Sequence, residues 1–468
     1  CPIPNLEDAL LLCEVLRVMK ESTSSLIIGF SFGLSLVGAL YVIKSIANAS
    51  REAAYGEKSS SSAASATASK TGAVAYESLI GNTPLVLLRA ASRVSGCDIY
   101  VKMESMNPGG TGKDRAAKSM LRAAEQHDPK YHPGCSVVEG TSGSTGIALA
   151  NLCLARGLHL HIVMPDDQAE EKRQLLECLG AKVTIVPNCA ISNANHYVNT
   201  AKRLAADLDG IFINQFENLS NFQAHVETTG PEIWNQCKGK LDAFVMSAGT
   251  GGTIGGISQY LKSRNSEIEI VLADPHGSSL YSKVVHGVCY TPQQAERKIK
   301  KHRYDSMVEG VGLDRVTANF AGAQIDAAEC VPDSEILETA HWLLANEGLF
   351  VGSSSALNVA AALRVAKRLG PGSTVVTVIC DTGQRHVSRF WNPEYVGKYG
   401  LLWPASGVVP QCVKDLEGRA VHSSTTTAIS ASAATISATN KGAKGQGEGE
   451  GEGRGLLSWL KVKLKIKV

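Results

Sequence analysis

The chain has 468 residues, which is more than one domain usually contains and predicts two to three folding units with appendages. Its formal net charge is only +2, so no overall basic field favours nucleic acid as a partner. The 12 cysteines are scattered without the paired CxxC spacing of a zinc site. We therefore expect buried, reduced thiols and no bound metal.

An apolar segment near the start of the chain, residues 26–43, contains no charged side chain and is flanked by Lys20 and Lys44. It falls just short of the roughly 20 residues that cross a bilayer, and Gly and Ser dilute its hydropathy. We expect one membrane anchor over 26–43, preceded by an N-terminal segment over 1–25. A cleaved signal peptide, suggested by Ala47-Asn48-Ala49, or an error in the gene model are the alternatives.

The next segment, residues 44–75, is rich in serine and alanine and offers almost no apolar surface to bury. A chain of small and polar residues cannot offset the entropy lost on folding. We predict a flexible tether between the anchor and the rest of the protein.

Between residues 76 and 404, short apolar runs alternate with longer helix-like stretches. The runs are 98–102, 136–139, 159–164, 182–186, 243–246, 269–274 and 374–379. Nearly continuous apolar strands separated by helices are typical of parallel sheets that are covered on both faces. We therefore predict an α/β catalytic domain over 76–404.

Past this core the pattern ends, and residues 405–468 are predicted to be a low-complexity tail. They contain a stretch rich in Ser, Thr and Ala over 423–439 and a repeat of Gly and Glu over 445–455. Neither composition supports a packed core. The last residues alternate lysine with apolar side chains, which has the period of a strand, but we expect a disordered tail.

Three glycine-rich loops interrupt the core. They cover residues 107–115, which include Lys113, then 139–146 and 247–253. Loops of Gly, Ser and Thr let backbone N–H groups converge on a phosphate or carboxylate, and a following helix adds its positive dipole. One such loop alone could be an ordinary turn between a strand and a helix. A lysine together with two further anion-binding loops indicates an enzyme that uses a cofactor.

Taken with other motifs, these loops resemble those of the cysteine synthase and cystathionine β-synthase family, pyridoxal phosphate enzymes of the tryptophan synthase β type. The resemblance begins at residues 78–85 and continues through the three loops to residues 214–218, 225–231, 308–312, 352–355 and 380–383. It implies a two-lobed tryptophan synthase β-like fold with mostly parallel sheets. It also implies an amino-acid substrate, sulfide or a thiol as its reaction partner, and a homodimer.

The resemblance assigns roles to the loops. Lys113 matches the catalytic lysine that holds pyridoxal 5'-phosphate, and burial beside the cofactor should lower its pKa. The phosphate would be bound by Gly249, Thr250, Gly251, Gly252 and Thr253. The substrate carboxylate would be bound by Thr141, Ser142, Gly143 and Thr145, with Gln215 completing the clamp.

Two serines complete the expected cofactor site. Ser354 matches the serine that contacts the pyridine nitrogen, with Ser353 and Ser355 as neighbouring alternatives, and a hydroxyl there suits elimination at Cβ. Ser144 stands where the family usually has an asparagine that hydrogen-bonds the phenolic oxygen of the cofactor. This departure puts efficient cysteine synthesis in doubt. The chain is similar to a divergent, membrane-associated branch, the fungal enzymes called cysteine synthase 2.

Three functions follow from the resemblance. The first is a cysteine synthase, which converts O-acetylserine and sulfide into cysteine and acetate. The second is a cystathionine β-synthase or a serine dehydratase-type lyase, because Glu309-Gly310-Val311-Gly312 resembles the former, although no tandem regulatory module follows residue 400. The third is a non-catalytic cofactor-binding scaffold at a membrane, against which the intact Lys113 argues. The expected location is the mitochondrial outer membrane, with the catalytic domain facing the cytosol; another intracellular membrane or the cytosol is the alternative.

Overall fold

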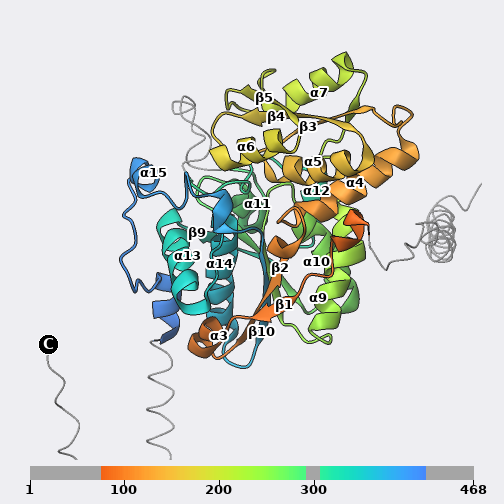
Figure 1. The fold of residues 1–468 in the computed structure, drawn as a ribbon. Helices are drawn as coiled ribbons and strands as arrows, with labels where there is room; N and C mark the ends of the chain where they lie inside the picture. Colours follow the sequence, from red (N-terminus) through yellow and green to blue (C-terminus); the bar gives the residue numbers. More distant parts are fainter. Residues whose placement is uncertain (1–74, 291–305, 418–468) are drawn as a thin grey trace, which may run out of the picture. The chain divides into compact units, whose positions relative to one another are not determined.

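The structure is a computed structural model that describes residues 75–290 and 306–417 (Figure 1). In these residues the larger of two sheets has six strands in the order β1-β2-β10-β7-β8-β9, and only β1 runs antiparallel to its neighbour. Its strands are β1 (Leu85–Leu87), β2 (Asp98–Met103), β7 (Ala243–Ser247), β8 (Glu269–Pro275), β9 (Ala327–Val331) and β10 (Thr374–Ile379). The helices that cover this sheet are α3 (Arg89–Ser95), α9 (Gly230–Gln236), α10 (Gly252–Arg264), α11 (Leu280–His286), α13 (Asp333–Glu347) and α14 (Ser353–Leu369). We call this half the large lobe.

The smaller sheet has four parallel strands in the order β5-β4-β3-β6 and forms the small lobe, drawn in orange to green at the top of Figure 1. The strands are β3 (Ser136–Gly140), β4 (His159–Pro165), β5 (Lys182–Val186) and β6 (Ile211–Phe212). The helices α5 (Ser144–Arg156), α6 (Glu170–Cys178) and α7 (Tyr197–Asp207) pack with them. The predicted α/β class with mostly parallel sheets is therefore confirmed.

The remaining elements join the lobes or border them. They are η2 (Tyr76–Leu79), η3 (Glu104–Met106), α4 (Lys113–His127), α8 (Ser220–Ala224), the π-helical turn η4 (His225–Thr229), α12 (Ala318–Ala321), η6 (Gly383–Arg385) and α15 (Pro393–Lys398). The helix α4 packs against α5 of the small lobe and also against α8. Its first residue is therefore held where the lobes meet.

Each sheet is covered by apolar side chains on both faces. In the large lobe, one face packs against α13 and α14, and the opposite face packs against α9 and α10. The small-lobe sheet packs against α4 and α5 on one side and against α7 on the other. The alanine-rich sequence of α14 lets this almost fully buried helix approach both α13 and the strands β7 and β10 closely. These rigid layers fix the loops at the carboxyl ends of the strands.

Several of the predicted segments lie outside the described residues. These are the anchor at 26–43, the tether up to residue 74 and the tail from residue 418 onward. Within the part of the chain that the structure describes, no helix is long and apolar enough to cross a membrane.

The boundary predicted at residue 404 needs a correction, because the packed core continues to Glu417. A helical stretch at 411–417 buries Cys412, Val413 and Leu416 against the large lobe. Three apolar residues in less than two turns were too weak a pattern to stand out beside the low-complexity sequence that follows.

Candidate active site

A cavity of about 720 Å³ lies at the carboxyl ends of the parallel strands and is lined by residues of both lobes. It brings together most of the predicted site residues. They are Lys113, Ser142, Ser144, Thr145, Gln215, Gly249, Thr250, Gly251, Thr253 and Ser354. Thr141, Gly143 and Gly252 belong to the same turns but do not line the cavity. Loops more than a hundred residues apart therefore converge on one space, as a single binding site requires.

Lys113 is the first residue of α4, and its side chain lines the cavity. The Thr111 hydroxyl oxygen accepts a hydrogen bond from the Lys113 backbone N–H at 3.0 Å, which fixes the start of the helix. Burial of the amine lowers its pKa below the ordinary value of lysine. Among residues 75–290 and 306–417, no acidic side chain forms an ion pair with Lys113. The site thus provides an amine that can be neutral and act as a nucleophile or base.

The turn from β7 to α10, residues 248–252, is one of the two glycine-rich turns that face the cavity. A side chain at Gly249 would place its Cβ 2.2 Å from the carbonyl oxygen of Gly310. Gly251 has a φ of +85°, and a Cβ there would lie 2.6 Å from Cα of Phe320. Only glycine fits these two positions, because both clashes are with backbone atoms. The close approach leaves the N-terminus of α10 at the cavity, and backbone N–H groups at the start of a helix can bind an anion.

Side chains brace this turn from the side away from the cavity. The Thr250 hydroxyl oxygen accepts a hydrogen bond from Asn221 Nδ2 at 2.9 Å, and the Thr250 carbonyl oxygen accepts one from the Thr317 hydroxyl at 2.7 Å. Thr253, one residue into α10, is 3.1 Å from Nε2 of His225. The turn is therefore held in shape by contacts within the protein, which is the preorganisation that a binding site requires.

The turn from β3 to α5, residues 141–143, is the second glycine-rich turn. Gly143 has a φ of +131°, and its N–H donates to the Thr141 hydroxyl at 3.1 Å. The Thr145 hydroxyl donates to Gln215 Oε1 at 2.5 Å, while Gln215 Nε2 donates to the Gly140 carbonyl at 2.9 Å. Gln215 thus braces this turn in addition to lining the cavity, and it also hydrogen-bonds the buried carboxyl group of Glu139.

The three consecutive serines at the start of α14 have different positions. The Ser353 hydroxyl accepts from the Glu309 N–H at 3.2 Å, and the Ser355 hydroxyl accepts from the Cys380 N–H at 2.9 Å. Both side chains are fully buried, and Ser354 is the one of the three that lines the cavity. The geometry therefore favours Ser354 over its two neighbours as a ligand-contacting residue.

A group of buried charges beside the cavity connects the lobes, and it was not predicted. Lys172, on α6 of the small lobe, forms an ion pair with Glu309, whose backbone is anchored on α14 of the large lobe. Arg389 Nε lies 2.9 Å from the same carboxylate. Burial alone would raise the pKa of Glu309, but Lys172, His386 and Arg389 hold it well below its usual range. We call Lys172, Glu309 and Arg389 the lobe bridge. Residues 308–312 were noted as a motif, but Lys172 belongs to no motif.

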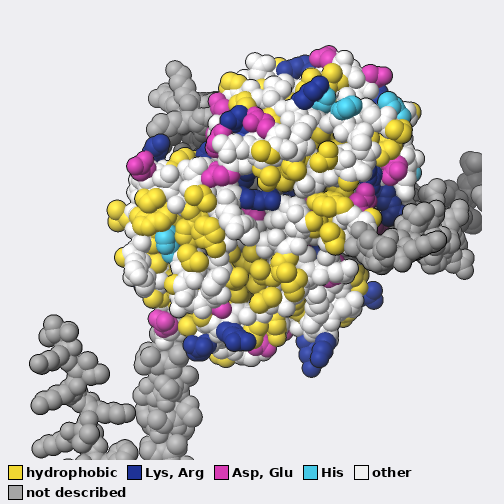
Figure 2. All heavy atoms as spheres, in the orientation of Figure 1, with side chains coloured by type: hydrophobic (Ala, Val, Ile, Leu, Met, Phe, Trp, Pro, Cys, Tyr) yellow, Lys and Arg dark blue, Asp and Glu magenta, His cyan; other side chains and the backbone are white. Residues whose placement is uncertain are grey.

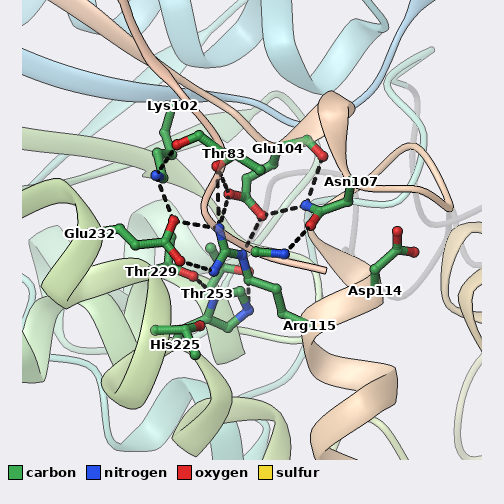
Figure 3. Close-up of polar contacts among 12 residues, drawn as sticks. Thr83, Lys102, Glu104, Asn107, Asp114, Arg115, His225, Thr229, Glu232 and Thr253 are labelled. Atoms are coloured by element: carbon green, nitrogen blue, oxygen red, sulfur yellow. Dashed lines mark hydrogen bonds and ion pairs between the residues drawn. The ribbon is translucent and has the colours of Figure 1, made fainter. Parts of the chain in front are cut away.

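A second unpredicted group of charges lies behind the β7–α10 turn (Figure 3). Glu232 on α9 pairs with Lys102 Nζ at 2.6 Å and with Arg115 Nη1 at 2.6 Å, and Arg115 Nε pairs with Glu104 at 2.8 Å. Burial would raise the pKa of Glu232, but Arg115 and Lys102 lower it to about 2. These four side chains form the buried charge network. It ties α4, which begins at Lys113, to the strand β2 and the helix α9.

Comparison with known proteins places this arrangement in a family. The family model described as "Pyridoxal-phosphate dependent enzyme" matches residues 76–381. The chain is 48% identical over 352 residues to "Cysteine synthase 2" of Schizosaccharomyces pombe, and the aligned region covers 73% of this chain and 87% of that protein. It is 46% identical over 327 residues to the "Putative mitochondrial cysteine synthase" of Saccharomyces cerevisiae, and the aligned region covers 67% of this chain and 83% of that protein.

A solved structure supports the same placement. The O-acetylserine dependent cystathionine β-synthase of Helicobacter pylori superimposes with a TM-score of 0.59 at 30% identity, over 68% of this chain and 98% of that one. The match spans both lobes and the turns that face the cavity, so the resemblance read from the motifs is confirmed. The chain belongs to the family of pyridoxal-phosphate dependent enzymes.

Proposed function

We propose that this protein is a cysteine synthase, which exchanges the acetoxy group of O-acetylserine for sulfide and releases cysteine and acetate. The observation that carries the proposal is the convergence of a buried lysine with a lowered pKa and two glycine-rich turns on one cavity. The identity of 46–48% to relatives named cysteine synthase supports the same reaction.

The residues present fit pyridoxal 5'-phosphate. The β7–α10 turn has the properties of a phosphate site, since any side chain at Gly249 or Gly251 would fill space now occupied by neighbouring backbone. Gly252 and the hydroxyls of Thr250 and Thr253 complete the proposed phosphate site. Lys113 would hold the aldehyde end of the cofactor, and Ser354 would contact its pyridine nitrogen. When bound, the cofactor supplies an electron sink that acidifies the Cα–H bond and weakens the bond from Cβ to its leaving group.

The chain itself supplies binding and proton transfer. In the proposed reaction the neutral amine of Lys113 takes the proton from Cα of the substrate, which is the transfer that a lowered pKa favours. Ser142, Gly143 and Thr145, with Thr141 bracing the turn, bind the α-carboxylate through N–H and hydroxyl donors. Gln215, which lines the cavity and accepts from the Thr145 hydroxyl, completes this clamp. Acetate leaves from Cβ, the sulfide sulfur bonds to the same carbon, and the amine of Lys113 returns the proton to Cα.

Ser144 lies on the cavity wall at the position where the family usually has asparagine. Its hydroxyl is shorter than the amide it replaces, so we propose that a water connects it to the phenolic oxygen of the cofactor. This predicts a slower reaction than an asparagine would give, without a change of reaction type.

A second candidate is cystathionine β-synthase chemistry, in which a thiol of an amino acid replaces sulfide. The loop Glu309-Gly310-Val311-Gly312 favours it, because the sequence of this loop resembles that of cystathionine β-synthase and the loop lines the cavity. The similarity to the H. pylori enzyme, whose name states that it uses O-acetylserine, also favours it. With O-acetylserine as the substrate, the two candidates share the first half of the reaction and differ in the incoming nucleophile.

Product analysis separates the candidates. Purified protein reconstituted with pyridoxal phosphate is given O-acetylserine with sulfide, O-acetylserine with homocysteine, or serine with homocysteine, and products are identified by mass spectrometry. Cysteine from the first mixture supports the proposal. Cystathionine without cysteine supports the second candidate, and absence of any product with cofactor bound supports a scaffold.

A matched pair of lysine variants tests the role of Lys113. Lys113→Ala should lower the rate by about 10³-fold or more, whereas Lys118→Ala on the same helix should keep it near the parent value. Lys118 instead donates to the Glu77 carbonyl at 2.8 Å. Borohydride reduction followed by peptide mapping should find the cofactor attached to Lys113, and attachment to Lys118 would overturn the assignment.

We also propose that the protein is mitochondrial, which the name of the yeast relative supports. The finer proposal places it at the outer membrane with the catalytic domain facing the cytosol, anchored by the uncharged segment 26–43. Carbonate extraction and protease protection of isolated mitochondria test this. Release of a variant lacking residues 1–74 from the membrane fraction is expected, and equal retention of both forms would contradict the anchor.

A homodimer is the proposed assembly. Exposed apolar side chains at Val86, Leu87 and Met106 lie on and beside β1 and β2, and Figure 2 shows hydrophobic side chains gathered over this part of the surface. Burial of such side chains would stabilise a contact between two copies. Sedimentation of the parent and of Leu87→Lys should give a dimer and a monomer respectively.

A further inference from the structure

A single histidine lies directly behind the proposed phosphate site. His225 begins the π-helical turn η4 and is only 1% exposed. Its Nε2 is 3.1 Å from the hydroxyl of Thr253, and its Nδ1 is 2.8 Å from the hydroxyl of Thr229 (Figure 3). Thr253 lines the cavity, whereas His225 does not. The imidazole therefore contacts the binding site only through the threonine in front of it. π-Helical turns within helices occur often at functional sites.

His225 is neutral in the folded protein. Burial lowers its pKa to about 3, and the nearby guanidinium of Arg115 acts in the same direction. Glu104 and Glu232 act in the opposite direction, but both carboxylates already pair with Arg115. A neutral imidazole donates through one nitrogen and accepts through the other. One of the two threonine hydroxyls therefore accepts a hydrogen bond from the ring, and the other donates one to it.

The direction of the Thr253 hydroxyl depends on which nitrogen carries the proton. If Nε2 accepted from Thr253, the threonine proton would point at the histidine and the oxygen lone pairs would face the cavity. If Nε2–H donates to Thr253, the threonine oxygen is satisfied and its proton is free to turn toward the cavity. A phosphate dianion is bound by donors and repelled by lone pairs. Only the second arrangement makes Thr253 a phosphate ligand.

We propose that His225 is a positioning residue for the cofactor phosphate, with its proton on Nε2. This inference rests on the proposed pyridoxal phosphate site. Thr229 then donates to Nδ1, Nε2–H donates to Thr253, and Thr253 donates to the phosphate. All three hydrogen bonds point toward the negative charge, so each one polarises and strengthens the next.

The buried charge network lies close to the imidazole, since Glu104, Arg115 and Glu232 all act on its pKa. Arg115 lies two residues after Lys113 on α4, and it pairs with Glu232 on α9, the helix that η4 leads into. The network contains two cations and two anions, so its charges compensate one another. It surrounds the histidine with fixed charges without adding a net charge that would protonate it.

Two amide substitutions at His225 distinguish the roles of the two ring nitrogens. In His225→Gln the side-chain NH₂ can reach the place of Nε2 and still donate to Thr253. In His225→Asn the NH₂ reaches only the place of Nδ1, so the contact with Thr253 is lost. Both variants are made as apoprotein, and the dissociation constant of pyridoxal phosphate is measured by fluorescence titration, with the ³¹P shift of the bound phosphate as a second reading.

We expect His225→Asn to weaken cofactor binding about 10- to 100-fold, as loss of one hydrogen bond to a charged group does, and to shift the ³¹P signal. His225→Gln should stay within about threefold of the parent. Equal binding by the parent and His225→Asn would overturn the inference, as would equal weakening by both variants. Thermal unfolding of each apoprotein shows whether the fold is intact.

A double-mutant cycle with Thr253→Val tests whether the histidine acts through this threonine. If it does, His225→Asn causes little further loss in the Thr253→Val background, and an undiminished loss there would contradict the relay. These outcomes are independent of the proposed reaction. A parent that binds pyridoxal phosphate without making cysteine would refute the reaction and leave the cycle intact, whereas a parent that fails to bind the cofactor would refute both.

Discussion

The two glycine-rich turns that face the cavity have the same local design and different surroundings. Each joins a buried parallel strand to the N-terminus of a helix. At Gly249 and Gly251, in the β7–α10 turn, the atoms that exclude a side chain belong to the backbone of neighbouring segments. At Gly143, in the β3–α5 turn, they belong to the side chain of Lys172, a member of the lobe bridge. Similar motifs can thus give one rigid turn and one whose surroundings can adjust.

This difference suits the two proposed ligands. A cofactor that stays bound requires a site that keeps its shape, which a turn enclosed by backbone provides. A substrate that enters and leaves requires a site that can open, and the β3–α5 turn belongs to a lobe joined to the rest by side-chain contacts. The comparison therefore predicts that changes at the β7–α10 turn affect cofactor retention. Changes near the β3–α5 turn should affect binding of the amino-acid substrate.

The largest effect is expected from Gly249→Ala. A methyl group there would lie 2.2 Å from the Gly310 carbonyl oxygen, so either the β7–α10 turn or the backbone at Gly310 must move. We expect cofactor affinity to fall by about 100-fold or more, equal to roughly 3 kcal/mol. The matched control is Gly146→Ala in α5, where the nearest atoms are side-chain methyls at 3.0 to 3.2 Å and alanine favours the helix. Equilibrium dialysis of both variants checks this, and equal affinities would break the comparison.

Breaking the lobe bridge at Lys172 should have the next largest effect, on substrate binding and stability. Lys172→Met leaves the buried Glu309 with Arg389 as its remaining cation within the bridge, and removal of one partner from a buried pair costs about 3 kcal/mol. We expect a raised KM for O-acetylserine and a lower melting temperature, with cofactor affinity little changed. Lys172→Met combined with Glu309→Gln should recover part of the stability, because the buried carboxylate is removed and Arg389 keeps its hydrogen bonds to the Asp167 carbonyl and the Tyr395 hydroxyl. Steady-state kinetics and calorimetry measure both effects.

Acid should destabilise the region behind the β7–α10 turn through Glu232. Its pKa is lowered from 4.5 to about 2, so its contribution to the free energy of unfolding is present above pH 4.5. That contribution is lost as the pH falls from 4.5 toward 2, and amounts to about 2–3 kcal/mol in full. Urea unfolding at pH 6 and at pH 3 should show the loss in the parent. A parent and a Glu232→Gln variant with the same pH dependence would contradict it.

The smallest effect is expected from Ser144→Asn, which restores the usual side chain of the family at the start of α5. A direct hydrogen bond to the cofactor contributes about 0.5 to 1.5 kcal/mol, so activity with O-acetylserine should rise roughly two- to tenfold. Stopped-flow absorbance of the first half of the reaction measures this. Loss of activity would show that the serine belongs to a pocket packed around a different substrate.

The sequence pattern was sufficient to predict the α/β class, and the family resemblance implied that Lys113, the turns at 141–145 and 249–253, and Ser354 form one site. The turns are local features, because a strand followed by glycines and a helix start places a loop at the end of a sheet. The partnership of Lys172 with Glu309 could not be predicted, since the two residues are far apart in the chain and meet only when the lobes pack. The same holds for His225, whose motif was noted while its contact with Thr253 depends on the packing of η4 against α10.

The position of β10 in the large sheet has a consequence for how the protein is made. This strand, residues 374–379, lies between β2 and β7, although it leaves the ribosome last of the three. The small-lobe sheet is built from the single stretch 136–212 and can form during translation. The large sheet has an open gap between β2 and β7 until β10 is synthesised, so its apolar strand edges stay exposed during most of synthesis. Nascent chains halted before residue 374 are therefore the species that should need chaperones most.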